Sequence, residues 1–119
     1  MDNKRKIGNS YEEIAIKYLH NNGYKIIDKN FQVKQGEIDI IAYDEETIVF
    51  IEVKYRSGSS SGHPLEAVTY SKQKRICKAA LFYLNKFKIS PFNSKIRFDV
   101  IGILGEEIIH IKNAFDYVG

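Results

Sequence analysis

The sequence predicts an α/β protein in which helices flank a central mixed β-sheet, with the element order α-β-β-β-α-β-β. Three observations predict this class. Apolar residues recur at helical spacing in two segments, β-branched and aromatic residues fill five others, and turn residues separate the segments. Helices on the faces of one twisted sheet are the packing that this order favours. Because 119 residues suit one core, we expect a single domain over residues 1–119.

The first half of the chain predicts one helix and three strands. Residues 10–22 are expected to form the helix, with Ser10 as its N-cap, because one face collects Tyr11, Ile14, Ala15, Tyr18 and Leu19. Residues 24–33, 37–43 and 48–54 are rich in strand-forming side chains. The acidic turn at residues 44–47 joins the last two strands into a β-hairpin.

The second half predicts a loop, a helix and two strands. Residues 57–64 are rich in serine and glycine and indicate a flexible surface loop, followed by a short helical turn at 65–70. Ser71 is expected to cap a helix that ends near Phe87, before Pro91. Strands are predicted over residues 96–103 and 108–112, with a turn at 105–107 between them.

Composition excludes several classes of protein. A hydrophobic share of 44% supplies a real core and excludes wholesale disorder. Cys77, the single cysteine, cannot form an intramolecular disulfide, which fits a reducing compartment. No apolar run approaches the roughly 20 residues that span a bilayer, and the first ten residues are polar and basic. We therefore expect a cytoplasmic protein with no membrane partner.

Positive charge is concentrated in one stretch of the chain. The formal net charge is +3, but residues 54–78 hold six basic residues against the single acid Glu66. Such a surface suits a nucleic-acid backbone, although an ordinary solvated helix face has the same composition. The candidate phosphate contacts are Arg56, Lys72, Gln73, Lys74 and Arg75.

The predicted hairpin places acidic side chains next to one another. Side chains alternate along a strand, so Glu37 and Asp39 share one face, whereas Ile38, Ile40 and Ala42 share the other. A turn of two or four residues sets Asp39 across from Glu52 and Glu37 across from Lys54. Two acids directly opposite one another need a compensating cation.

A divalent metal is one explanation of this pair. Oxygen ligands without histidine or cysteine favour Mg²⁺ or Mn²⁺, held by Asp39, Glu52 and the Val53 carbonyl. Lys54 would then orient a water molecule or neutralise charge on a phosphate in the transition state. The alternative is a solvated strand face on which Lys54 simply pairs with Glu37. Asp99, in an apolar strand, is expected to have a structural role.

The hairpin also carries a family resemblance. Gly36-Glu37-Ile38-Asp39, with Asp39 thirteen positions before Glu52-Val53-Lys54, resembles the catalytic hairpin of PD-(D/E)xK nucleases, which have the restriction-endonuclease-like fold. Further segments extend the likeness over nearly the whole chain and resemble the YraN-type family of bacterial proteins: Gly8 through Glu12, Ala15, Tyr18-Leu19, Gly23-Tyr24, Asn30-Phe31, Phe50-Ile51, Arg56, Arg97 through Val100 and Asn113-Ala114-Phe115.

The resemblance implies a metal-dependent endonuclease site formed by Glu12, Asp39, Glu52 and Lys54. Glu12 matches a glutamate on the first helix of the similar archaeal Holliday-junction resolvases, although an acid there also simply favours a helix N-terminus. The expected substrate is DNA rather than RNA, with branched or junction DNA as one class, and the resolvase likeness suggests a homodimer. A non-catalytic nucleic-acid-binding module and an interaction protein of the same fold are the alternatives.

Overall fold

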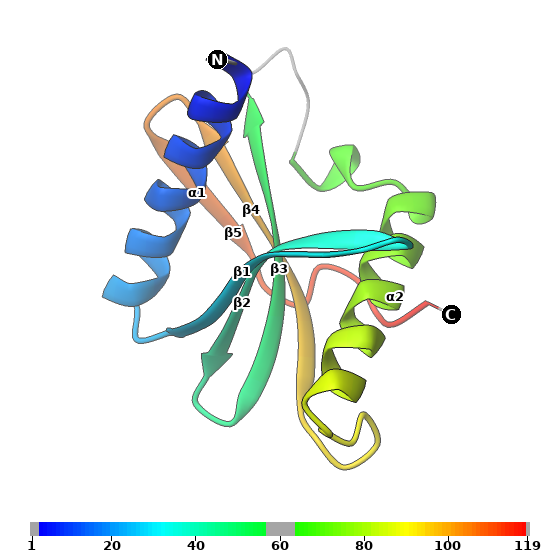
Figure 1. The fold of residues 1–119 in the computed structure, drawn as a ribbon. Helices are drawn as coiled ribbons and strands as arrows, with labels where there is room; N and C mark the ends of the chain where they lie inside the picture. Colours follow the sequence, from blue (N-terminus) through cyan, green and yellow to red (C-terminus); the bar gives the residue numbers. More distant parts are fainter. Residues whose placement is uncertain (1–2, 57–63, 119) are drawn as a thin grey trace.

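Five strands and two long helices follow one another in the predicted order (Figure 1), so the predicted fold class is confirmed. The computed structural model describes residues 3–56 and 64–118. A short 3-10 helix, η2, precedes the second long helix. The elements are α1 (Asn3–Asn21), β1 (Lys25–Val33), β2 (Gly36–Asp44), β3 (Thr47–Arg56), η2 (Pro64–Ala67), α2 (Tyr70–Lys86), β4 (Ile96–Leu104) and β5 (Glu107–Ile111).

The strands form one mixed sheet in the order β1-β2-β3-β4-β5. Neighbouring strands are antiparallel except for β3 and β4, which pair in parallel from Ile48 opposite Ile96 to Arg56 opposite Leu104. Parallel neighbours need a crossover connection, and here η2 and α2 supply it. The crossover therefore carries the basic stretch of the chain back along the sheet.

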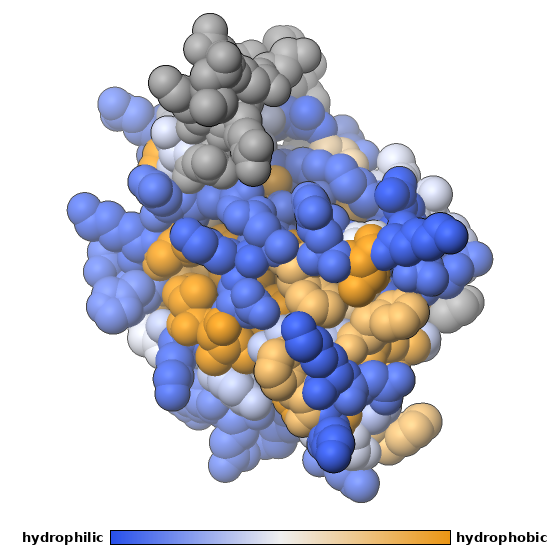
Figure 2. Space-filling view, viewed as in Figure 1, coloured by the Kyte–Doolittle hydropathy of each residue, from blue (hydrophilic) through white to orange (hydrophobic). Residues whose placement is uncertain are grey.

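The two helices cover opposite faces of the sheet (Figure 1). On α1, Ala15 and Leu19 are buried against one face, with Ile40 and Ile51 among their neighbours. The apolar stripe of α2 is buried against the other face and includes Ile76, Cys77, Ala79, Ala80, Tyr83 and Leu84. Figure 2 shows apolar side chains gathered in the middle of the side seen in Figure 1, with polar side chains around them.

The register of the β2–β3 hairpin is the predicted one. Ile40 lies opposite Ile51 and Asp44 lies opposite Thr47, so Glu45 and Glu46 form a two-residue turn. Glu45 has a φ of 54°, a left-handed conformation of the kind that tight hairpin turns require. One predicted face was wrong: Ile38 packs with the α2-side cluster rather than with Ile40 and Ala42.

The pairing of β2 explains why Ile38 lies on the α2 side of the sheet. Its described pairs with β3 end at Ile40, while the pairs with β1 continue to Gly36. The β1 register also shifts between Ile26 and Asp28. Strand irregularities of this kind bend a ribbon and interrupt strict alternation. The free end of the β1–β2 hairpin accordingly reaches toward α2 (Figure 1).

Some predicted boundaries also needed correction. α1 begins at Asn3 rather than Ser10, since good helix formers at positions 4–6 extend it toward the N-terminus. α2 is capped by Thr69 rather than Ser71, because the Thr69 hydroxyl accepts the Lys72 N–H at 3.2 Å. The predicted loop at 57–64 lies outside the described residues except for Pro64, with which η2 begins. No helix in the described part of the chain is long and apolar enough to cross a membrane.

Candidate active site

Asp39 and Glu52 stand side by side on β2 and β3, facing the N-terminal end of α2. The described β2–β3 pairs end at Ile40 and Ile51, which are directly adjacent to Asp39 on β2 and to Glu52 on β3, and the two carboxyl groups meet through a side-chain hydrogen bond. The Asp39 carboxylate accepts the backbone N–H of Val53 at 2.8 Å, and it also hydrogen-bonds the Glu52 carboxylate. Only 6% of Glu52 is exposed. The pairing of β2 with β3 and the backbone N–H of Val53 therefore hold Asp39 and Glu52 in place.

The environment of Asp39 disfavours its charged form. Burial, followed by the charge of Glu52 and the hydrogen bond with it, raises the pKa of Asp39 to about 8. The N–H of Val53 works in the other direction. The Asp39 carboxyl consequently keeps its proton at neutral pH and can donate it to Glu52 in the hydrogen bond between them when no metal ion is bound.

Glu52 is neutralised by the chain's own lysines. Its Oε2 atom lies 3.1 Å from Lys54 Nζ and 3.3 Å from Lys72 Nζ. The sequence had placed Lys54 opposite Glu37, but Glu37 instead accepts a hydrogen bond from Gln32 across the β1–β2 pair. The compensating cation that the acidic pair needs is thus present in the protein itself.

The pKa values of the two lysines are shifted in opposite directions. Burial lowers the pKa of Lys72, and the adjacent Lys54 lowers it further. Burial also works to lower the pKa of Lys54, but its hydrogen bonds with Lys72 and Glu52, together with the charges of Glu52 and Asp39, raise that pKa above its ordinary value. The pKa of Lys54 is thus raised and that of Lys72 is lowered, although both lysines contact the same oxygen of Glu52.

These side chains line a cavity of about 370 Å³ between the hairpin and α2. Its walls carry three acids and three bases, so it presents both signs of charge over a short distance. Such a polar, open hollow accommodates a phosphate group together with its counterion. The residues that line it are Glu37, Asp39, Glu52, Val53, Lys54, Lys72, Arg75 and Ile76.

Glu12, on α1, lies apart from this cavity. It is not among the residues that line the cavity, and it hydrogen-bonds the Asn30 side chain. Burial raises the pKa of Glu12, and the charges of Glu37 and Glu52 raise it further, whereas Asn30 lowers it. Glu12 thus interacts with the acidic pair through its charge while its described hydrogen bond goes elsewhere.

The residues that were predicted to contact phosphate lie in different environments. Arg75 lines the cavity, whereas Lys74 lies 5.7 Å from the centre of the exposed Tyr70 ring. The Gln73 side chain donates to the Val68 carbonyl at 3.1 Å, within its own segment.

Arg56 continues the strand face of Glu52 and Lys54, two residues further along β3. Its Nε atom is the only buried side-chain nitrogen or oxygen without a hydrogen-bond partner in the described part of the chain.

Sequence reasoning placed Lys72 on a general DNA-binding surface and missed its contact with Glu52. The contact depends on where α2 docks, which no local pattern reveals. One signal was available: Gly36 opens β2, and a side chain there would collide with the Arg75 carbonyl of α2. This close approach seats the first turns of α2 directly over the acidic pair.

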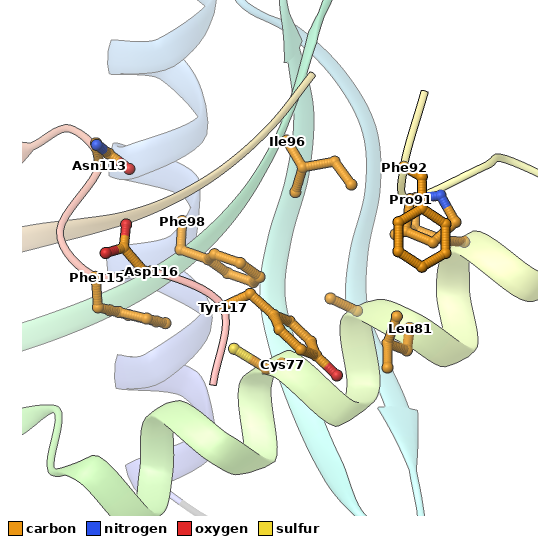
Figure 3. Close-up of a pocket in the computed structure, with 12 residues that line it drawn as sticks. Cys77, Leu81, Pro91, Phe92, Ile96, Phe98, Asn113, Phe115, Asp116 and Tyr117 are labelled. Carbon is orange, nitrogen blue, oxygen red and sulfur yellow. The ribbon is translucent and has the colours of Figure 1, made fainter. Parts of the chain in front are cut away.

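A second cavity, of about 470 Å³, is larger but chemically different (Figure 3). Cys77 and Leu81 of α2, Phe98 of β4 and Tyr117 of the C-terminal segment lie around it. Its only charged lining residue within the described chain is Asp116, and Phe92 at its rim is 93% exposed. A largely apolar hollow with one carboxylate lacks the paired groups that hydrolysis requires.

Asp99 anchors a separate buried network, as its predicted structural role requires. It is fully buried and accepts hydrogen bonds from Arg97 Nε at 2.8 Å and from the Asn113 N–H at 2.9 Å. His110 Nε2 lies 2.7 Å from Asp99 Oδ2. Arg97 extends the network to Asp44 at 2.9 Å and to Tyr24 at 2.8 Å.

The sequence of the chain is similar to the sequences of known proteins. Residues 11–103 match the Uncharacterised protein family UPF0102. The chain belongs to this family. A UPF0102 protein of Clostridioides difficile is 46% identical over 97% of this chain and 100% of its own. UPF0102 proteins of Persephonella marina and Vibrio campbellii are 45% and 46% identical, over 92% and 93% of both chains respectively. The likeness to the YraN-type family is thereby confirmed, while the UPF0102 names state no activity.

Proposed function

We propose that this protein is a divalent-metal-dependent endonuclease that hydrolyses phosphodiester bonds in DNA. The observation that carries the proposal is the pairing of Asp39 with Glu52 beside Lys54 in an open cavity that α2 lines with further bases. Two oxygen-donor carboxylates and a lysine are the groups that phosphodiester hydrolysis uses. The restriction-endonuclease-like resemblance of the same hairpin supports this assignment.

The donor set fits Mg²⁺ or Mn²⁺. In the described part of the chain no three acidic, histidine or cysteine side chains are placed so that together they could hold a metal ion, but Mg²⁺ commonly takes one or two carboxylates plus water and phosphate oxygens. Asp39, Glu52 and the Val53 carbonyl would hold the ion. When bound, it would polarise the scissile phosphate and acidify a water molecule.

The remaining side chains act on the substrate. Lys54, held 3.1 Å from Glu52, would neutralise charge that develops on the phosphate oxygens. Lys72 and Arg75, on the α2 wall of the cavity, would bind the phosphate backbone. Glu12 would contribute its charge to the acidic pair from α1. A homodimer and a cytoplasmic location remain predictions that accompany this proposal.

One observation favours a non-catalytic nucleic-acid-binding module instead. Lys54 and Lys72 already neutralise Glu52, and a proton on its carboxyl relieves Asp39, so the acidic pair does not require a metal for stability. The two functions make different demands on Asp39. Catalysis needs its carboxylate, whereas binding through the basic side chains does not.

The test is cleavage of labelled four-way junction, flap, single-stranded and duplex DNA, and of RNA, with Mg²⁺ or Mn²⁺. Wild type is compared with Asp39→Asn and Glu52→Gln, whose folding is checked by circular dichroism. Metal-dependent cutting that both substitutions abolish supports the nuclease, and the preferred substrate identifies its class. Absence of cutting, with salt-sensitive binding by all three proteins, supports the binding module.

A further inference from the structure

We propose that Lys72 exchanges partners during the reaction cycle: it neutralises Glu52 before metal binds, and it contacts the DNA phosphate once the metal occupies Glu52. This inference rests on the proposed function. Its starting point is the crowding around a single atom, since both Lys54 and Lys72 contact Oε2 of Glu52, at 3.1 and 3.3 Å.

The crowding leaves little room for a further cation. A carboxylate oxygen has two lone-pair directions, and two ammonium groups at hydrogen-bond range occupy both on Oε2. A divalent ion on the same carboxylate would also stand beside two positive charges in a partly buried site, where repulsion is weakly screened. Withdrawal of one lysine would free Oε2 and relieve this repulsion when the ion arrives.

Lys72 is the lysine that is free to leave. The Lys54 side chain is 19% exposed and rises from the interior of β3, two residues from Glu52. The Lys72 side chain is 42% exposed and rises from the first turn of α2, and its ammonium group contacts Glu52 and Lys54. A half-exposed lysine on a helix can change rotamer without moving the main chain.

The cavity supplies a destination for the released ammonium group. Lys72 and Arg75 are three residues apart on α2, which places them on one face of the helix, and both line the cavity. This wall lies across from Asp39 and Glu52, so a phosphate between the acidic pair and α2 meets both bases. The Lys72 ammonium group would thus leave the Glu52 carboxylate and contact a phosphate oxygen instead.

The test uses two ligands with opposite expected responses. Lys72→Met keeps the length of the stem and removes the charge, while Lys95→Met, at a 73% exposed lysine outside the cavity, is the matched control. Mn²⁺ binding is measured by isothermal titration calorimetry without DNA. DNA binding is measured by fluorescence anisotropy with Ca²⁺, using the preferred substrate or, without one, a four-way junction.

Lys72→Met is expected to bind Mn²⁺ about 3- to 10-fold more tightly than wild type, because a competing cation has gone. The same protein is expected to bind DNA about 3- to 10-fold more weakly. Lys72→Arg retains the charge and should behave as wild type in both assays. If Lys72 has only a structural role, Lys72→Met should bind both Mn²⁺ and DNA more weakly than wild type.

The possible outcomes distinguish failure of the Lys72 exchange from failure of the proposed nuclease activity. If wild type binds Mn²⁺ and cuts DNA while Lys72→Met behaves like Lys95→Met, the exchange is wrong and the nuclease proposal stands. Weaker Mn²⁺ binding by Lys72→Met also overturns the exchange. If wild type binds no Mn²⁺ and cuts nothing, the nuclease proposal fails and the exchange fails with it.

Discussion

Gly36 packs directly against the main-chain carbonyl of Arg75, in the space that a side-chain Cβ would need. Gly36 opens β2 and Arg75 lies in the second turn of α2, so this contact joins the hairpin to the crossover helix. It sets how closely the basic wall of the cavity approaches Asp39 and Glu52. Any side chain at position 36 must push α2 outward or distort the strand.

Gly36→Ala is therefore expected to destabilise the protein by about 1–3 kcal/mol, the usual effect of overpacking a close contact. Urea unfolding followed by circular dichroism measures the change. Gly105→Asn is the control, because Gly105 has a φ of 59° that asparagine tolerates, and a Cβ there would meet no atom of the described residues within 4 Å. Equal effects of the two substitutions would argue against the tight contact.

Asp39→Asn is expected to stabilise the metal-free protein at neutral pH. Burial and Glu52 raise the pKa of Asp39 to about 8, so folding at neutral pH must take up a proton that the unfolded chain lacks. An amide can accept the Val53 N–H and donate to Glu52 without that proton. We expect a gain of roughly 1–4 kcal/mol, measured by urea unfolding in EDTA.

The gain should depend on pH with a definite sign. Below the ordinary aspartate pKa of 3.8, both folded and unfolded wild type hold the proton, so the substitution has its smallest effect. As pH rises from there toward about 8, wild type loses stability relative to Asp39→Asn. The exposed Glu46→Gln serves as control and should show no such trend. A difference that is constant with pH would contradict the raised pKa.

Asp99→Asn is expected to destabilise the protein by about 3 kcal/mol at neutral pH, because Arg97 loses its buried counter-charge. Burial works to raise the pKa of Asp99, but hydrogen bonds from His110, Arg97 and Asn113 together hold it below its ordinary value. The stabilisation that ionised Asp99 contributes is therefore complete above pH 3.8. It is lost as the pH falls through the lower pKa that Asp99 has in the folded protein. Unfolding free energies should converge in acid, and a gap that widens there would refute this assignment.

Lys74→Ala combined with Arg75→Ala should weaken DNA binding uniformly across sequences. Each lost phosphate contact removes about one counterion, so the slope of log K against log salt concentration should fall by about 2. Fluorescence anisotropy over a salt series gives the slope. Lys95→Ala, a 73% exposed side chain paired with Glu46, is the matched control. An unchanged slope would place the DNA elsewhere on the surface.

The sequence was most informative where structure is local. The two-residue turn at Glu45 and Glu46 determines the hairpin register, and the register determines that Asp39 meets Glu52. Helical spacing likewise predicted the face of α1 on which Ala15 and Leu19 are buried, although Ile14 on that predicted face is exposed. Residues close in sequence have few alternative arrangements, so pattern and turn chemistry sufficed.

What could not be predicted depends on tertiary packing. The bend that turns Ile38 toward α2 arises where β2 leaves β3 and stays with β1. The pairing of Lys72 with Glu52 arises only when the crossover helix docks. Glu12 does not line the cavity, since α1 covers the opposite face of the sheet, and only its charge reaches the acidic pair. No local pattern specifies such long-range distances.

The parallel pairing of β3 with β4 has a consequence for the order in which the protein assembles. A hairpin closes within about 1–10 μs, so Asp39, Glu52 and Lys54 can meet early. Pairing Ile48 with Ile96 requires closure of a long segment that includes α2, and non-local pairing is slow. Lys72 thus reaches Glu52 only in this later step. The folding chain therefore passes through a stage in which Asp39 and Glu52 are close together with Lys54 but without Lys72. Mildly acidic pH should stabilise that stage, because it reduces the repulsion between the two carboxylates.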